Sequence, residues 1–505
     1  MKPLNETKRM SGLIRSALKL VSGNVVAQAI GIATMPLVTR LYSPSDFGVF
    51  AVFISVLAVL GPVSTLRFNE TIVLPESRTD AIHLLRLSCI CVLMFSLVIL
   101  ILAGFYITFF KALRVIDLGG NKAYLWLLPL GVFLRGSLLS INSMAIRETI
   151  FKKMAISEVL IKASDRFIVL VEGILTRLGA FGLIIGRLAG VGTGVAYMLQ
   201  SGLRDILKEI FRELSFGEMK RLFYRYRQFP LYGTWSILLH TASKEMPVII
   251  LAGMFSSLVT GHYALGANMI YLPMIIAGYS LNKTFLQHAV SCKNKREELA
   301  GEIRRMLTYL TYLALPFILI LLFLGDRIFG LFFGARWLEA GVYIQILAPS
   351  FFFVFLYIPL RSLFIIFERP RERLIFDFFY FILRGGSLLL TGLITQSVRS
   401  SLLAMSIVTC VYLFLFFFYA SSLLEMNRFF FVGVLFQKAL LMFPMAAGLL
   451  LIRSCLPPNM IVSAVALIGL LVVQCVLFVL TDSILRENVT VFLGITQKMP
   501  GDGSI

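Results

Sequence analysis

Five charged side chains lie within one apolar stretch of membrane length, residues 155–175, which reads AISEVLIKASDRFIVLVEGIL. On an α-helix these charges fall on an arc of about 120°, and the opposite face is apolar. Five uncompensated charges would cost roughly 12–17 kcal/mol in lipid. We therefore expect the charged face to look into a helix bundle or a wet cavity. The five residues are Glu158, Lys162, Asp165, Arg166 and Glu172.

Other apolar stretches also contain charged residues, and cations outnumber anions among them. Surplus cations in a low dielectric favour an anionic ligand, and the planar fork of arginine suits phosphate or carboxylate. The predicted binding cations are Arg135, Lys162, Arg166, Arg187, Lys244 and Arg384, with Asp165 and Glu245 as charge-balancing or proton-carrying carboxylates and Asn24 and Gln28 as polar lining. The alternative, a network of ion pairs that only holds helices together, stays open at this stage.

The composition indicates the elements that must position these residues. The chain has 505 residues, of which 58% are hydrophobic and 15% are charged, and its mean hydropathy is +0.88, whereas soluble domains are about a quarter charged. We predict an all-α polytopic membrane protein. We count fourteen spans, possibly twelve, near residues 17–39, 47–66, 87–110, 124–145, 155–175, 178–200, 231–252, 258–282, 307–325, 338–360, 374–395, 401–423, 432–452 and 460–481.

The distribution of basic residues sets the orientation. With the N-terminus in the cytoplasm, about two thirds of the 47 lysines and arginines lie in cytoplasmic segments. Both termini are therefore predicted to be cytoplasmic. The net charge of +20 reflects this bias and attraction to anionic headgroups, so no nucleic-acid partner is expected.

Two longer cytoplasmic connections, 204–228 and 287–306, mix basic, acidic and apolar residues at helical spacing. Each fits an amphipathic helix at the inner interface or, equally, a solvated charged connector.

A faint internal repeat divides the chain into halves. LYSPSDFGVFAV (41–52) can be laid over MFSSLVTGHYAL (254–265), so that Ser43 matches Ser256 and Gly48 matches Gly261. A shift of six spans gives parallel repeats about an axis along the membrane normal, an arrangement that recurs in transporters with the substrate site between the halves. The predicted segments are a six-helix bundle at 1–203, a connecting loop at 204–228, a second six-helix bundle at 229–425, and two additional helices with a tail at 426–505.

Glycines recur at four-residue intervals in the sixth span, at Gly182, Gly186, Gly190 and Gly194. Such a ladder permits close helix contact. Tight packing is the simpler interpretation, and a flexing element is the alternative.

Motifs for catalysis are not found where they could work. The chain has no HExxH, P-loop or nucleophile-elbow motif in a suitable place, and the external loops are short. None of the six cysteines forms a CxxC pair. We therefore expect no enzyme activity, no catalytic residue, no metal and no cofactor.

Four stretches carry a family resemblance: MPLVTRLYSPSDFGVFAVF (35–53), LRFNETIVLPES (66–77), SLNKTFLQHAVSCKN (280–294) and FGLFFGARWLEAGVYIQILAPSFFFVFLYIPLRSLF (329–364). Over about residues 1–425 the chain resembles the Wzx-type flippases of polysaccharide repeat units, such as O-antigen. That family shares a superfamily with multidrug and toxin extrusion proteins and the lipid II flippase.

The resemblance implies two six-helix bundles in a V-shaped exporter arrangement, with about two extra C-terminal helices. It implies that undecaprenyl-pyrophosphate-linked oligosaccharides of O-antigen, capsule or exopolysaccharide move from the cytoplasmic to the outer leaflet of the bacterial inner membrane. Alternating access through a cationic cavity, and polymerase and chain-length regulator proteins as partners, are further expectations. Two alternatives stay open: a multidrug or cation extruder of the same superfamily and, less favoured, a membrane polysaccharide polymerase or ligase.

Overall fold

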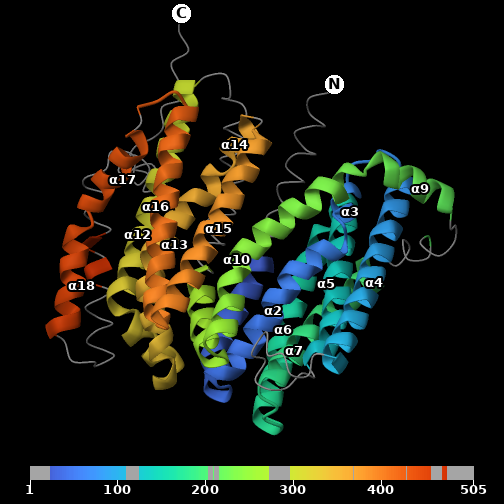
Figure 1. Ribbon diagram of the computed structural model, residues 1–505, viewed down its shortest axis with the longest axis horizontal. Helices are drawn as coiled ribbons and strands as arrows, with labels where there is room; N and C mark the ends of the chain where they lie inside the picture. Colours follow the sequence, from blue (N-terminus) through green and yellow to red (C-terminus); the bar gives the residue numbers. More distant parts are fainter. Residues whose placement is uncertain are drawn as a thin grey trace, which may run out of the picture. The chain divides into compact units, whose positions relative to one another are not determined.

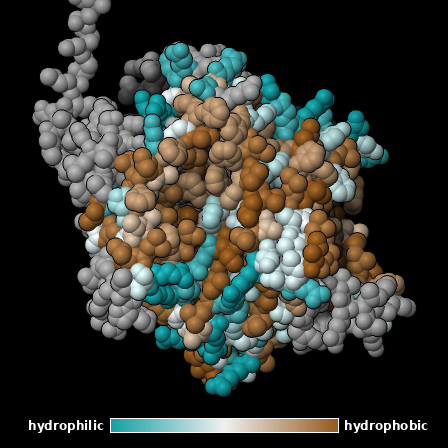
Figure 2. All heavy atoms as spheres, turned by 60° about the vertical axis from the view of Figure 1, so that its left-hand side comes forward, coloured by the Kyte–Doolittle hydropathy of each residue, from teal (hydrophilic) through white to brown (hydrophobic). Residues whose placement is uncertain are grey.

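The chain folds as a set of membrane-length helices. The computed structural model describes residues 23–109, 124–202, 209, 215–271, 296–367, 369–427, 429–455, 469–471 and 473–474. These residues form helices and connecting turns, with no strand (Figure 1). Ten of the helices are long and apolar enough to cross a membrane, and hydrophobic side chains cover much of the face in Figure 2. The prediction of an all-α multi-pass membrane protein is confirmed.

The helix that carries the charged stretch is α6 (Phe151–Leu175). At 25 residues it is long enough to span a membrane, yet it is not one of those ten helices because charged side chains interrupt its apolar sequence. Its charges must therefore be accommodated by neighbouring helices.

The chain divides into two compact units, each built from separate segments. Unit 1 comprises Met1–Asn268, Phe332–Trp337 and Leu374–Ser401, and unit 2 comprises Met269–Leu331, Leu338–Arg373 and Leu402–Ile505. The bundle boundaries drawn from the sequence, with a connecting loop at 204–228, stay a prediction.

Unit 1 holds the N-terminal helices together with later ones. Helices α2, α4, α5, α6 and α7 lie side by side (Figure 1), and α10 packs along α2. The helical elements of unit 1 are Gly23–Leu41, α2 (Pro44–Ser64), α3 (Phe68–Thr71), α4 (Arg78–Phe109), α5 (Tyr124–Arg147), α6, α7 (Ala180–Tyr197), η1 (Met198–Gly202), α9 (Phe216–Arg225), η2 (Phe229–Gly233), α10 (Thr234–Met254), most of the helix at 257–271, η3 (Ala335–Trp337) and most of α15 (Pro370–Thr395).

Unit 2 has an aromatic-rich core, in which Phe417 stacks on Phe431 with ring centroids 5.9 Å apart. Its helices are α12 (Arg296–Phe333), α13 (Leu338–Leu360), α14 (Leu363–Ile366), α16 (Val398–Leu423), α17 (Phe430–Leu440) and α18 (Phe443–Cys455).

The two predicted amphipathic loops have different structures. Within 204–228 the structure has an amphipathic helix, α9, with Met219 and Leu222 buried. Residues 296–306 instead continue into the long helix α12, because buried Leu299 and Ile303 extend its apolar stripe. Residues 287–295 lie outside the described residues.

The C-terminal spans also differ from expectation. The single helix expected at 432–452 is two shorter helices, α17 and α18, separated by a turn at Leu441 and Met442. Pro444 lies at the start of α18, where a proline is tolerated, whereas within one continuous helix it would remove a hydrogen bond. Most of the last predicted span, 460–481, lies outside the described residues.

The internal repeat forms a reciprocal contact within unit 1. Ser43 accepts a hydrogen bond from the Asp46 amide at 3.2 Å, and its repeat partner Ser256 accepts one from the Val259 amide at 3.3 Å. The two serines cap α2 and the helix at 257–271 in the same way. This equivalence supports the alignment drawn from the sequence.

The matched glycines lie where these two helices cross. A Cβ placed on Gly48 would lie 1.7 Å from the carbonyl oxygen of Ser257, and a Cβ on Gly261 would lie 1.7 Å from that of Pro44. Only glycine permits this backbone-to-backbone approach at either position.

Trp337 packs beside this crossing. It is fully buried, its indole Nε1 donates to the Thr39 carbonyl at 3.1 Å, and its ring meets the edges of Phe47 at 5.0 Å and His262 at 5.7 Å between centroids. The short helix η3 is thereby fixed against the N-terminal helices of unit 1.

Candidate functional site

The charged helix α6 is held between α7 and the first described helix. The glycine ladder of α7 lies directly on α6: a Cβ on Gly190 would lie 2.6 Å from the Ile161 carbonyl oxygen, and one on Gly194 would lie 2.3 Å from Cγ1 of Ile161. The ladder therefore packs the two helices closely, as its spacing predicts.

The helix Gly23–Leu41 runs parallel to α6 along another side. On this helix, a Cβ built on Gly23 would lie 2.6 Å from Ala155, and one on Gly31 would lie 2.7 Å from Lys162. On α6, a Cβ built on Gly173 would lie 3.0 Å from Tyr42. At the far end, the Tyr42 hydroxyl donates to the Val169 carbonyl at 2.7 Å. Burial, with Glu172 and Asp46 nearby, raises the pKa of Tyr42 to about 12, so this donor keeps its proton.

Asp165 is the most buried of the charged residues on α6, with 4% of its surface exposed. Its carboxylate lies 3.9 Å from the Arg187 guanidinium of α7. Gly186 and Gly190 lie against its backbone, which holds the residue in place. Asp165 therefore pairs across the helix contact, and not with Lys162 or Arg166 on its own helix.

Lys162 and Arg166 have no such partner. Among the described residues, neither makes an ion pair or a hydrogen bond, and the buried Nε of Arg166 has no acceptor. The Lys162 side chain lies against the backbone of Gly31. Its electrostatic neighbours are Arg166, Asp165, Arg187 and Glu158.

Arg135 reaches the same region from α5. Its side chain lies against Gly61 of α2, where an added Cβ would come within 2.6 Å of Arg135 Cγ, and its electrostatic neighbours are Arg187 and Glu158. We call the resulting group of four cations and two anions the α6 cluster: Arg135, Glu158, Lys162, Asp165, Arg166 and Arg187.

Glu172 belongs elsewhere, although the helical wheel places it on the same arc. Its carboxylate accepts a hydrogen bond from Thr176 at 2.7 Å at the end of α6. A Cβ on Gly182 would lie 2.9 Å from both this carboxylate and the Tyr42 hydroxyl, so Glu172 contributes to the end of the helix.

A second charged group lies on α10 against α2. Glu245 accepts a hydrogen bond from Ser55 at 2.8 Å and lies 3.5 Å from the Lys244 ammonium. The Glu245 side chain is 15% exposed, whereas that of Lys244 is 54% exposed. Glu245 therefore joins the two helices, and Lys244 presents most of its length away from the packed contact.

Arg384 of α15 lies beside this group. It is 6% exposed, donates to the Ser243 carbonyl at 3.4 Å, and its guanidinium lies 5.8 Å from the Tyr380 ring centre. Gly385 makes room for Met246 of α10. We call Lys244, Glu245 and Arg384 the α10 cluster. Both clusters flank α2, at Gly61 and Ser55.

The two residues predicted as polar lining make fewer contacts than the charged residues. Asn24 is exposed and Gln28 half-buried on the first described helix, and neither makes a hydrogen bond within the described part of the chain. Sequence reasoning missed Ser55, Gly31 and Gly61, whose roles depend on partners distant in the sequence. A single serine or glycine in an apolar helix carries no signal that could have identified them.

The chemistry of the two clusters suits an anion. Guanidinium and ammonium groups donate to phosphate or carboxylate oxygens, and surrounding apolar helices strengthen these interactions. Within the residues that the structure describes, no group of three or more His, Cys, Asp or Glu side chains could hold a metal ion.

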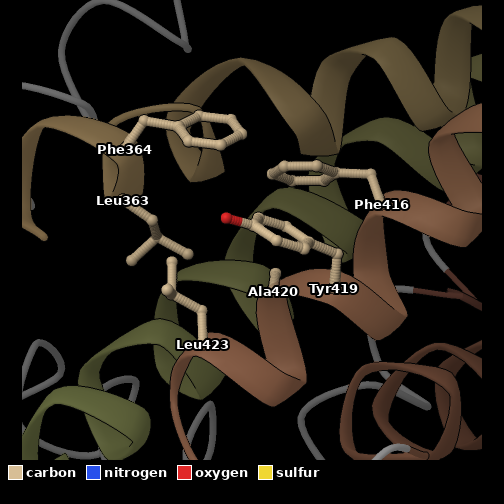
Figure 3. Close-up of a pocket in the computed structure, with 6 residues that line it drawn as sticks. All are labelled: Leu363, Phe364, Phe416, Tyr419, Ala420 and Leu423. Carbon is tan, nitrogen blue, oxygen red and sulfur yellow. The ribbon is translucent and has the colours of Figure 1, made fainter. Parts of the chain in front are cut away.

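A small pocket in unit 2 offers no comparable chemistry (Figure 3). Its empty space, part of it open to solvent, is about 140 Å³. The Tyr419 hydroxyl, its polar group, donates to Glu372. The lining residues are Leu363, Phe364, Phe416, Tyr419, Ala420 and Leu423. We interpret it as a packing gap between aromatic side chains.

The fold is shared with solved exporters at low sequence identity. The lipid II flippase MurJ, in an inward closed conformation, is 12% identical with a TM-score of 0.69, over 94% of this chain and 100% of that one. An inward-facing multidrug resistance MATE family transporter of the MOP superfamily is 13% identical with a TM-score of 0.58, over 80% and 94%. A MOP superfamily transporter from Pyrococcus furiosus, described as having a binding pocket of reverse polarity, is 13% identical with a TM-score of 0.55, over 82% and 95%.

These likenesses confirm the exporter fold that the resemblance implied. No curated protein matches the sequence. The family model described as "Polysaccharide biosynthesis protein" matches residues 37–342, which is more than half of the 505 residues. The chain belongs to this polysaccharide biosynthesis protein family.

Proposed function

We propose that this protein is a flippase for undecaprenyl-pyrophosphate-linked oligosaccharides, the repeat units of O-antigen, capsule or exopolysaccharide. It moves them from the cytoplasmic to the outer leaflet of the bacterial inner membrane by alternating access. The family and the exporter fold support a transporter of a lipid-linked substrate. The choice of an anionic substrate rests on the charged residues.

The observation that carries the proposal is the net positive charge of the α6 cluster. Asp165 pairs with Arg187, while no carboxylate makes an ion pair with Lys162 or Arg166 in the described part of the chain. Both cations are half-buried, and a charge removed from water is costly unless it is paired. A pyrophosphate, or an acidic sugar, would supply the missing negative charge to Arg135, Lys162, Arg166 and Arg187.

The α10 cluster provides a second group of cations. Lys244 is largely exposed along its side chain and Arg384 is held against α10. Both would contact the headgroup at a different point from the α6 cluster, with Asn24 and Gln28 as polar lining. A substrate with several charges or a long oligosaccharide would use both groups.

Alternating access requires a contact that separates. With both termini in the cytoplasm, as the distribution of basic residues indicates, the Gly48–Ser257 crossing and Trp337 lie at the outer ends of their helices. This contact would close the outer side in the present conformation and part when the substrate leaves.

Coupling to a proton gradient would involve Asp165 or Glu245. Each carboxylate is buried or nearly so and each contacts a cation, so protonation would release that cation. Replacing both by amides (Asp165→Asn, Glu245→Gln) should change transport or its dependence on the gradient. If transport and its gradient dependence are unchanged, the coupling role is wrong.

Complementation tests the cationic site. In a strain that lacks the gene and has lost its surface polysaccharide, the variants Lys162→Ala, Arg166→Ala and Arg384→Ala should each restore about ten- to a hundredfold less polysaccharide than the unaltered protein, because a charge-assisted hydrogen bond to substrate is lost.

Matched controls lie on the same helices. Lys152→Ala on α6 and Arg371→Ala on α15 change exposed cations and should restore normal polysaccharide. Normal restoration by all three site variants, at normal protein levels, would refute the cationic site.

A multidrug or cation extruder is the second candidate function. The surplus of cations in the α6 cluster argues against it, since a cationic drug would be repelled. In the leading proposal, polysaccharide polymerase and chain-length regulator proteins act on the exported product and are the expected partners.

A further inference from the structure

The short helix α9 lies at the depth where several spans end. Its Leu222 is fully buried in a cluster with the first turns of α4 and α6 and the last turn of α5, represented by Ala81, Met154 and Met144. Helices α5 and α6 have 24 and 25 residues, more than the roughly 20 that cross the hydrocarbon core, so their ends and α9 lie at the level of the headgroups. Figure 1 shows it beside the ends of α3 and α4.

Ion pairs fix α9 in one rotation about its axis. Arg221 donates to Asp80 of α4 at 2.8 Å and lies 2.7 Å from Glu218. The charged side of α9 therefore faces the start of α4, and the buried side, Met219 and Leu222, faces the bundle.

The third side of α9 combines aromatic rings with a lysine. Phe216, Tyr224 and Phe223 are 74%, 57% and 38% exposed, and Lys220, also exposed, lies among them. On a helical wheel these four residues fall within an arc of about 100°. Phe223 contacts the buried ring of Phe68, with centroids 5.6 Å apart. The exposed aromatic surface that remains on this docked helix indicates a binding site.

We propose that this face, Phe216, Lys220, Phe223 and Tyr224, binds anionic phospholipid of the adjacent leaflet. Aromatic rings are favoured at the headgroup level, and a lysine beside them attracts a lipid phosphate. Exposed Arg227, just after the end of α9, adds to the attraction. Because α9 lies in the connection before α10, bound lipid would fix the start of α10 relative to the bilayer. The proposal is independent of the transported substrate.

Lipid quenching tests the proposal in the full-length protein. The six native cysteines are replaced, and an NBD fluorophore is attached at Tyr224→Cys or, as the matched control on the charged side, at the adjacent Arg225→Cys. Each protein is placed in nanodiscs of phosphatidylcholine alone or with increasing phosphatidylglycerol. Acyl-brominated lipid and aqueous iodide serve as the two quenchers.

We expect brominated lipid to quench the label at position 224 several times more strongly than the label at 225, and increasingly so with phosphatidylglycerol. Lys220→Gln should raise the phosphatidylglycerol fraction needed for half of this effect about fivefold, the change expected for one basic residue near an anionic surface. Equal iodide quenching at both positions would show a solvated face and overturn the proposal. Protection of position 224 from both quenchers would show a protein cover and would also overturn it.

Discussion

The charged residues of α6 have two kinds of role: some pair with a neighbouring helix, and some are cations without an ion-pair partner in the described part of the chain. Asp165 is buried beneath Gly186 and Gly190 and pairs with Arg187. Lys162 makes no ion pair or hydrogen bond in the described part of the chain. The structure thus favours different roles for two residues that are only one turn apart.

Stability should separate the two roles. Asp165→Ala leaves Arg187 without its carboxylate and should lower the free energy of unfolding by about 3 kcal/mol. Lys162→Ala removes a cation that lacks a partner and should leave the melting temperature of the purified protein unchanged or raise it. Equal losses of stability would contradict this division.

Gly31 should matter for transport because it makes room for Lys162. In Gly31→Leu the new side chain would displace the Lys162 ammonium, since even a Cβ lies 2.7 Å from Cε, and we expect about tenfold less surface polysaccharide in the complementation assay. Ala33→Leu, at an exposed position of the same helix, is the control and should behave normally. Normal transport by both variants would remove Gly31 from the site.

The sequence predicts the polar face of α6 better than the partners of its charged residues. Charge and helical spacing identify the polar face of α6, because lipid excludes such residues from the apolar face. They also place Glu172 in that group, although its carboxylate is bound by Thr176. The partner of Asp165 comes from α7, and a wheel drawn for one helix contains no information about the next.

At the scale of elements, the glycine ladder of α7 determines how α6 is placed. Gly190 lies against the α6 backbone, whereas Gly192 faces open space with nothing near its Cβ position. The two glycines are two residues apart on the same helix and differ in packing, which makes them a matched pair.

Their substitutions should act in opposite directions. Gly190→Ala should destabilise the protein by about 1–3 kcal/mol through overpacking against Ile161. Gly192→Ala should be neutral or stabilise it by about 0.5–1 kcal/mol, the usual gain of alanine over glycine in a helix. Chemical or thermal unfolding of the two variants measures the difference; similar values would mean that α6 and α7 separate easily.

Long apolar helices are predictable from hydropathy, and their ends are less so. The four-residue glycine interval predicts close contact with some neighbouring helix because its geometry is local, and the structure shows that this helix is α6. By contrast, α12 begins at Arg296 instead of near 307, and the turn at Leu441 and Met442 divides one expected helix. Hydropathy does not report where a helix extends beyond lipid or breaks within it.

At the scale of the whole molecule, the proposed transport cycle has the crossing of α2 with the helix at 257–271 open. Gly48→Ala would drive a methyl group into the Ser257 carbonyl and favour the open state. Val52 of α2 is 1% exposed. In a protein without native cysteines, Val52→Cys places a thiol at this position. When Gly48→Ala is also present, this thiol should react with a membrane-impermeant reagent applied from outside. With Gly301→Ala, where the space is open, the same thiol should stay protected. Protection in both variants would exclude this crossing as the outer closure.

The reciprocal contact at Gly48 and Gly261 has the geometry of an isologous dimer interface, in which each half presents the same patch to the other. Here both patches belong to one chain and lie at the positions that the internal repeat aligns. Two methyl groups placed at the equivalent positions would push apart the same pair of helices. Once the first has opened the contact the second should cost little, so Gly48→Ala and Gly261→Ala should be strongly non-additive in a double-mutant cycle.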